Sequence, residues 1–185
     1  MKKSLFISMI AVLMAGFLAS SAMADPDHHD NILVKFKGGI GVIPVSNVAG
    51  TANPDGTFPN VTRNIVRGVN PPGQIWRIDD LKAAVEINGH IRVHGRGLLL
   101  AGGNNIGTNA NQSVRARLFC GAAVHESKLV PLAANGDFKI NDILTPVSPT
   151  VTPLPPNPCD SPVLLILNSG GSWFAAGIPD RDSDH

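Results

Sequence analysis

Short runs in which apolar and polar residues alternate, separated by Gly and Pro, constrain the fold of this chain most strongly. Successive side chains of a β-strand point to opposite faces of a sheet, so such alternation predicts strands with one buried face. A 3.6-residue period is nearly absent, and 19 Gly and 15 Pro mark turns between the runs. We therefore expect an all-β protein, an antiparallel β-sandwich, of which the immunoglobulin-like sandwich is one form.

The predicted strands are regularly spaced, which favours one antiparallel domain over residues 25–185. Its core is expected at about 74–179, residues 30–72 add strands packed on the same sheets, and 25–31 and 180–185 form mobile tails. The segments that fit the strand pattern are Ile32–Phe36, Gly41–Val45, Asn64–Val69, Leu81–Ile87, His90–Leu100, Ser113–Cys120, Lys128–Leu132, Asp137–Leu144, Pro162–Leu167 and Trp173–Ile178.

One hairpin can be predicted down to its register. The three-residue loop Ile87-Asn88-Gly89, with its glycine in a left-handed conformation, pairs Val85 with Ile91 on the core side. The same register pairs Lys82 with His94 on the solvent side. A two-residue turn at the central Asn-Gly would instead mix apolar and charged side chains on each face. Burial therefore favours the three-residue loop.

The first residues have the features of a signal peptide. Lys2 and Lys3 precede an apolar run from Leu5 to Leu18, and Ala22-Met23-Ala24 provides a cleavage site after residue 24. The alternative, a retained membrane anchor, is disfavoured because the run is shorter than the roughly 20 residues that span a bilayer. No later segment approaches that length. We expect the processed protein to be periplasmic or extracellular.

Cys120 and Cys159 are the only cysteines in the chain. Export would place them where disulfides form and persist, so we expect them to be bonded to each other. The alternative is a pair of buried free thiols. The predicted bond would stabilise the fold by about 3–4 kcal/mol, according to the entropy of the loop it closes.

Basic side chains lie on the solvent side of two predicted strands. If the strands at 90–100 and 113–120 are neighbours, four guanidinium and two imidazole groups would form a band suited to phosphate, sulfate or carboxylate. The alternative is an ordinary solvated sheet face that also carries acids such as Glu86. The candidate ligand-binding residues are Arg92, Arg96, Arg115, Arg117, His90 and His94.

The remaining patterns disfavour several classes of function. The chain has 15 Lys and Arg against 14 Asp and Glu, and this near balance argues against a nucleic-acid-binding protein. His90 and His94 are four positions apart on a strand, about 13 Å, which is too far to chelate one ion. No Gly-x-Ser-x-Gly nucleophile motif occurs. We expect no catalytic residues, no metal site and no cofactor.

These observations favour a secreted or periplasmic, non-enzymatic protein with a binding or structural role and an anionic ligand. Two other classes stay open. A surface-assembly or adhesion subunit would show an exposed apolar patch or an open strand edge, first of all at Trp173–Ile178. A hydrolase or metal-dependent enzyme would gather His90, His94 or His125 with an acid such as Glu86 in one pocket.

Overall fold

The computed structural model describes residues 31–180, and these residues form strands and no helix. This part of the chain therefore contains no helix long and apolar enough to cross a membrane. The predicted signal peptide and almost all of both predicted tails lie outside the described residues. The strands have these bounds: β1 (Ile32–Gly41), β2 (Val45–Ala49), β3 (Asn60–Arg63), β4 (Trp76–Arg77), β5 (Asp80–Glu86), β6 (His90–Arg96), β7 (Leu99–Leu100), β8 (Ser113–Cys120), β9 (Ala123–Glu126), β10 (Val130–Pro131), β11 (Phe138–Ile143), β12 (Thr145–Pro146), β13 (Val163–Asn168) and β14 (Trp173–Pro179).

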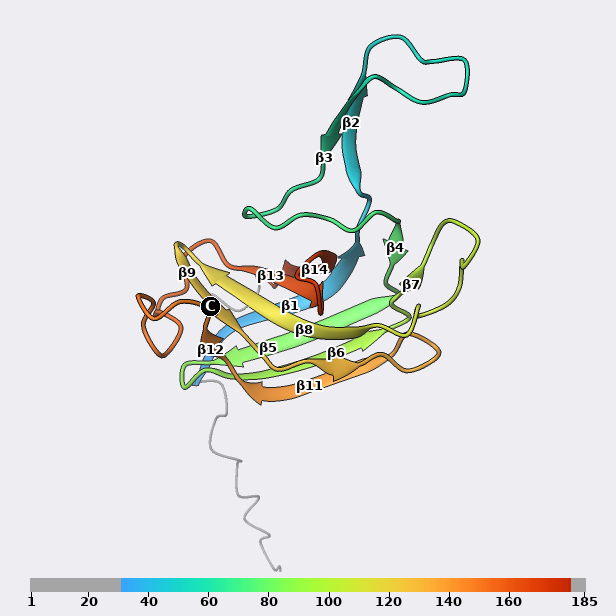
Figure 1. Cartoon of the computed structure of the whole chain (residues 1–185). Helices are drawn as coiled ribbons and strands as arrows, with labels where there is room; N and C mark the ends of the chain where they lie inside the picture. The colour runs from blue at the N-terminus through green and yellow to red at the C-terminus, as the bar shows by residue number, and fades with distance from the viewer. Residues whose placement is uncertain (1–30, 181–185) are drawn as a thin grey trace, which may run out of the picture.

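A ten-stranded antiparallel sheet dominates the fold. Its strand order is β11-β6-β5-β1-β14-β13-β8-β9-β12, and β10 pairs with the start of β8. The sheet curls back on itself, so that β8 and β13 lie across the core from β5 and β6 (Figure 1). The predicted all-β antiparallel fold is thereby confirmed, in a sandwich- or barrel-like form. An immunoglobulin-like domain divides its strands between two sheets, whereas backbone pairing here is continuous.

Strand alternation fills the space that the curled sheet encloses. Leu81 and Val85 of β5 and Ile91 and Val93 of β6 are fully buried, while their neighbours in sequence point outward. The predicted hairpin register is confirmed, because Val85 faces Ile91 and Lys82 faces His94. Gly89 has a φ of 82°, the left-handed conformation that the three-residue loop requires.

Strand β13 is buried on both faces rather than one. Its residues Leu164–Leu167 all lie in the core. Beside it, the segment 64–73 runs close to β14, where Trp173 Nε1 donates to the carbonyl oxygen of Asn64 at 2.9 Å. The backbone nitrogen of Trp173 also donates to the carbonyl oxygen of Asn70 at 3.1 Å. This irregular segment therefore lies against the outer side of the sheet.

The predicted disulfide joins Cys120, the last residue of β8, to Cys159. The second cysteine lies in the irregular segment that precedes β13. The bond therefore holds this segment beside the strand that neighbours β13 in the sheet.

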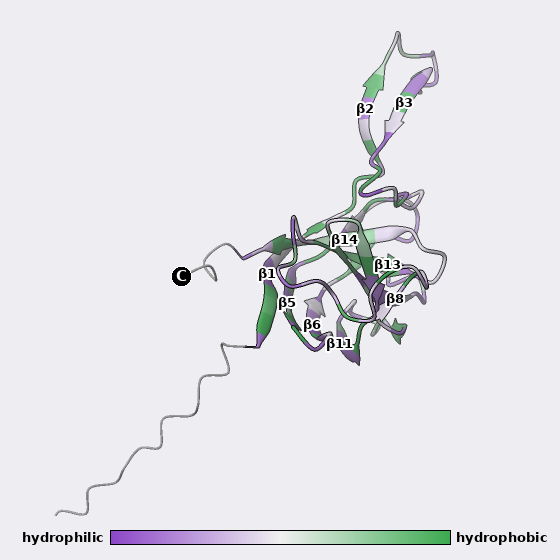
Figure 2. Ribbon diagram, turned by 90° about the vertical axis from the view of Figure 1, so that its left-hand side faces the viewer, coloured by the Kyte–Doolittle hydropathy of each residue, from purple (hydrophilic) through white to green (hydrophobic). Residues whose placement is uncertain are grey.

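The N-terminal part of the described chain divides between two places. Strand β1 enters the main sheet between β5 and β14, so the core begins well before residue 74. Strands β2 and β3 pair only with each other and form an arm (residues 43–65) that projects from the body (Figures 1 and 2). Of the extra strands expected from residues 30–72, β1 therefore lies in the main sheet, whereas β2 and β3 do not.

The strand predicted at Asn64–Val69 is not formed. Arg67 and Gly68 both have positive φ, 51° and 77°, and the resulting tight turn bonds Val66 to Val69. The turn therefore prevents an extended conformation over this segment. The short strands β3, β4, β9 and β12, in contrast, were not expected from the sequence.

Candidate functional site

The outer face of β1, β5, β6 and β11 carries a row of basic residues. Lys37 on β1 lies opposite Lys82 on β5, Lys82 lies opposite His94 on β6, and His94 lies opposite Lys139 on β11. Alternation explains the row, because each of these residues neighbours a buried apolar residue and so points outward. We call these four residues the basic row.

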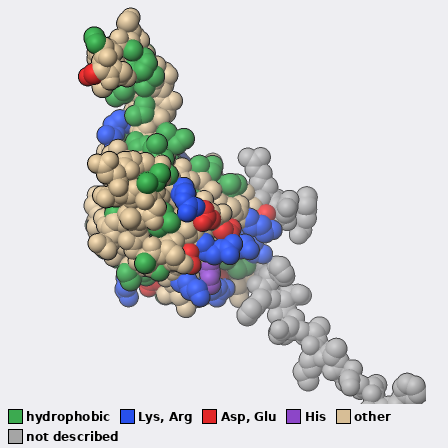
Figure 3. Space-filling view, turned by 90° about the vertical axis from the view of Figure 1, so that its right-hand side faces the viewer, with side chains coloured by type: hydrophobic (Ala, Val, Ile, Leu, Met, Phe, Trp, Pro, Cys, Tyr) green, Lys and Arg blue, Asp and Glu red, His purple; other side chains and the backbone are tan. Residues whose placement is uncertain are grey.

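A second line of residues runs beside the basic row on the same face. Lys35 lies opposite Ala84, Ala84 opposite Arg92, and Arg92 opposite Asn141. The small side chain of Ala84 leaves space between the two cations that flank it. Figure 3 shows Lys, Arg and His side chains gathered with acidic ones on the body of the molecule, away from the arm.

The positive charge of this face is only partly balanced. Within residues 31–180, Lys35, Lys82 and Lys139 form no ion pair. Lys37 is paired with Asp180 at 2.7 Å, although its side chain is 66% exposed. Cations directly opposite one another on neighbouring strands repel. The face is therefore a surface to which an anion would be attracted.

The arginines predicted on β6 are each paired with an acid on β5. Arg92 contacts Glu86 at 2.6 Å, and Arg96 contacts Asp80 at 3.3 Å. Both arginine side chains stay about half exposed or more, at 47% and 68%. They can therefore still offer N–H donors to a ligand.

His90 and Glu86 meet at the other end of β6. The His90 ring contacts Glu86 Oε1 at 3.4 Å and Asn141 Oδ1 at 2.6 Å. Partial burial opposes ionisation of Glu86, but the hydrogen bonds of His90 and Asn88 and the charge of Arg92 outweigh it and lower the pKa of Glu86 below 4.5. The carboxylate is thus held in its charged form and oriented toward Arg92.

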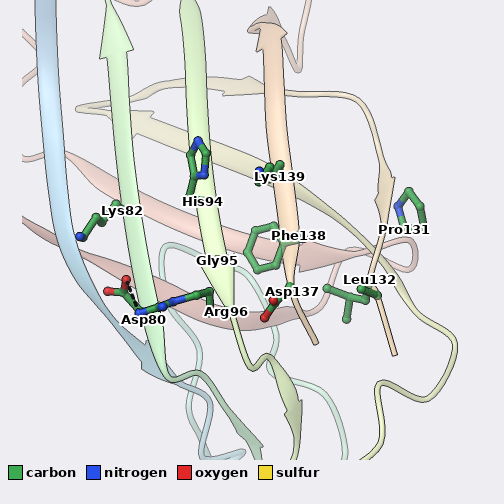
Figure 4. A pocket seen from close by; sticks show the side chains of 11 residues that line it. Asp80, Lys82, His94, Gly95, Arg96, Pro131, Leu132, Asp137, Phe138 and Lys139 are labelled. Carbon is green, nitrogen blue, oxygen red and sulfur yellow. Dashed lines mark hydrogen bonds and ion pairs between the residues drawn. The ribbon is translucent and has the colours of Figure 1, made fainter. Parts of the chain in front are cut away.

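Two hollows lie along the basic row. One, of about 460 Å³, is lined by three residues of the row, Lys37, Lys82 and His94, and by Lys35, Ala84 and Arg92. The other, of about 650 Å³, is lined by the same Lys82 and His94 and continues to Lys139, Asp80, Asp137, Pro131 and Leu132. Figure 4 shows Asp80, Arg96 and Asp137 toward one end of this second hollow, with His94 and Lys139 farther along their strands.

The structure divides the predicted arginine band into two groups. Strands β5, β1, β14 and β13 lie between β6 and β8, so Arg115 and Arg117 do not join Arg92 and Arg96. The band depended on β6 and β8 being neighbours, and this condition is not met. Alternation identifies the face on which a residue lies, but it carries no information about strand order.

Arg115 and Arg117 instead share one acid on the neighbouring strand β9. Arg117 Nε donates to Glu126 Oε1 at 2.5 Å, and Arg115 Nε lies 3.6 Å from Glu126 Oε2. All three side chains are largely buried, with 16–24% exposed. This cluster stabilises the β8–β9 pair and is poorly placed to receive a large ligand.

The three histidines considered for an enzyme lie in different surroundings, and His94 lines the larger hollow together with the acids Asp80 and Asp137. His90 contacts Glu86, but His125 is completely buried on β9, where its Nε2 lies 2.9 Å from the carbonyl oxygen of Thr152. No group of three or more His, Cys, Asp or Glu residues that could hold a metal ion occurs between residues 31 and 180. The basic face, with its two hollows, is the candidate site that we consider further.

The sequence alone did not predict most of the basic row. His94 was identified on the correct face, and the hairpin register already placed Lys82 opposite it. Lys37 and Lys139 follow the same alternation within their own strands. No pattern in the sequence indicates that β1 and β11 flank β5 and β6, so the row could not be assembled without the structure.

The fold and this face define an all-β, disulfide-bonded protein. Its two hollows together form a basic groove across β1, β5, β6 and β11. The chain matches no protein-family model, and comparison with curated proteins and with solved structures also gives no match. Any function must accordingly be argued from the residues themselves.

Proposed function

We propose that this chain is an exported, non-enzymatic binding protein that takes an anionic ligand on the outer face of β1, β5, β6 and β11. The observation that carries the proposal is the basic row, Lys37–Lys82–His94–Lys139, set in register across four strands. A bound anion would relieve the repulsion between the lysine charges and would gain charge-assisted hydrogen bonds from the unpaired Lys82 and Lys139.

Export is supported by two independent features. The sequence begins with the charge, apolar run and small-residue site of a signal peptide. The disulfide between Cys120 and Cys159 is of the kind that persists in oxidising compartments. We accordingly assign the ligand to the periplasm or the extracellular medium.

The proposal can be tested by chromatography of the purified protein on immobilised heparin, used as a general polyanion. Lys82→Gln combined with Lys139→Gln removes two unpaired charges of the basic row. We expect this variant to elute at clearly lower salt than the wild type, because fewer counterions are released on binding. Lys128→Gln is the control for each single substitution of this pair, since Lys128 is 88% exposed and lines neither hollow. Equal elution of the double variant and the control would contradict the proposal.

A second candidate function, assembly with a second copy of the chain, is favoured by the arm. The predicted assembly segment Trp173–Ile178 lies in the interior of the sheet, in β14 between β1 and β13, so it offers no open edge. The arm instead has two free strand edges and exposes large apolar side chains, namely Ile43, Val48, Phe58, Val61 and Ile65, at 39–60%. An isolated two-stranded hairpin has marginal stability in water, so burial against another arm would stabilise it.

Sedimentation equilibrium tests this second candidate. If arms associate, the wild type sediments above its monomer mass and Val61→Lys sediments as a monomer, because a charge on the strand opposes pairing. A monomeric wild type over the whole accessible concentration range would exclude assembly through the arm.

A further inference from the structure

We infer that the ligand of the basic face is an acidic polysaccharide whose chain lies across the strands, along the basic row. This inference rests on the proposed function and adds the class of ligand and its direction. Three features of the groove carry it: its length, its mixed charge and its apolar end.

The length of the groove favours a chain over a small anion. Both hollows are lined by Lys82 and His94, so together they extend over β1, β5, β6 and β11. Neighbouring strands lie about 4.8 Å apart, so the four residues of the row span about 14 Å. A single phosphate or sulfate would occupy one hollow and leave the unpaired lysine at the far end of the other, Lys35 or Lys139, without an anion. A linear chain with repeated anionic groups would contact the whole row.

The mixed charge favours a sugar chain over an inorganic polyanion. Asp80 and Asp137 line the same hollow as Lys82 and Lys139. Asp137 accepts hydrogen bonds from the Gly97 backbone nitrogen at 3.1 Å and from Asn135 at 2.9 Å, which leaves further lone pairs on the carboxylate. These carboxylates would repel polyphosphate, which offers no donors, but they can accept hydrogen bonds from sugar hydroxyl groups.

The apolar end of the groove fits the faces of sugar rings. The exposed ring of Pro131 lines the larger hollow beside Lys139, and the largely buried Leu132 and Phe138 border it. A pyranose ring carries C–H groups on its faces and hydroxyls at its edge, so it can use apolar and polar walls together. An acidic polysaccharide thus supplies anionic groups for the lysines, hydroxyl groups for the carboxylates and C–H ring faces for the apolar end.

Calorimetric titration of the full processed protein with galacturonate monomer, dimer and longer oligomers tests the inference. We expect affinity to rise by at least about tenfold from the monomer to an oligomer that spans the row, because the later contacts become intramolecular. We also expect the oligomer to bind more tightly than inorganic polyphosphate of equal charge. Equal affinity for all oligomer lengths, or tighter binding of polyphosphate, would overturn the inference.

A pair of variants tests the role of the carboxylates. Asp80→Asn and, separately, Asp137→Asn make the face more positive, so both should strengthen polyphosphate binding. The preference for oligogalacturonate over polyphosphate should fall in each, because the amide is a weaker acceptor for sugar hydroxyl groups than the carboxylate it replaces. This ratio is measured on the same folded sample and does not depend on a loss of stability. An unchanged ratio in both variants would contradict the assignment of sugar hydroxyls to Asp80 and Asp137.

The outcomes separate the two proposals. If heparin, polyphosphate and oligogalacturonate all fail to bind, the proposed function itself fails. If polyphosphate binds at the basic row and oligogalacturonate does not, an anionic ligand stands and the polysaccharide is excluded. Lys35→Gln and Lys139→Gln should each weaken binding of the long oligomer, because these residues line opposite ends of the groove.

Discussion

The ring of Phe138 lies over Gly95, the residue opposite it on β6, and occupies the space that a Cβ atom at position 95 would need. Gly95→Ala should therefore displace the ring and lower the free energy of unfolding by about 1–3 kcal/mol, a typical cost of overpacking. Urea denaturation measures the change. Gly73→Ala is the control, because no atom lies within 4 Å of its Cβ position, and its effect should stay within about 0.5 kcal/mol. Similar losses in both variants would contradict this packing.

The bond between Cys120 and Cys159 closes a loop between residues 39 positions apart. Replacing both cysteines by serine should lower the free energy of unfolding by about 3–4 kcal/mol, because the unfolded chain regains conformational freedom. Urea denaturation of the variant and of the oxidised wild type gives the difference. If a reducing agent leaves the wild-type midpoint unchanged while mass spectrometry shows free thiols, the bond does not stabilise the fold.

The ionisation of Glu86 should make the free energy of unfolding depend on pH. Its pKa is lowered in the folded state, so it binds a proton less readily there than in the unfolded chain. The stabilisation is complete above 4.5, its ordinary pKa, and is lost as the pH falls through the lowered folded value. Glu86→Gln should be less stable than the wild type at neutral pH, and the difference should shrink in acid. Urea denaturation across the pH range checks this, and a constant difference at every pH would count against it.

The pair of Arg117 and Glu126 should contribute to stability and not to binding. Glu126→Gln leaves two largely buried guanidinium groups without their carboxylate, which should cost about 1–3 kcal/mol of unfolding free energy. Elution from heparin should stay the same, because β8 lies away from the basic face. If this variant kept wild-type stability but eluted from heparin at a different salt concentration, Arg115 and Arg117 would belong to the ligand site.

Local patterns predicted the parts of the fold that depend on neighbouring residues. The hairpin at Ile87–Gly89 is an example, because the turn glycine and the alternation on both sides favour the same register. The pairing of Cys120 with Cys159 needed only a count of cysteines and the expected compartment. Both predictions involve few alternatives, and the structure confirms both.

Strand order depends on contacts between residues far apart in the chain, and alternation does not encode it. Lys37 and Lys82 are opposite one another only because β1 lies between β14 and β5 in the sheet and pairs with β5. Because alternation does not encode strand order, Arg92 and Arg115 were combined in one predicted arginine band. The sequence therefore identified the outer side of β5 and β6 but not β1 and β11, the strands that flank this pair.

The left-handed turn at Arg67 and Gly68 was also beyond prediction. Position 67 holds a residue that rarely adopts positive φ, so its sequence gives no turn signal of its own. The hydrogen bond from Arg67 to the carbonyl oxygen of Ser161, far along the chain, helps to hold this conformation. Local propensity was overridden here by a tertiary contact.

The location of the bound anion tests the central claim most directly. Backbone amide spectra of the isotope-labelled protein, titrated with a heparin oligosaccharide, report which strands the ligand contacts. We expect shift changes at Lys37, Lys82, His94 and Lys139 and at their neighbours on β1, β5, β6 and β11. Changes confined to the arm or to β8 and β9, with none along the basic row, would contradict the account.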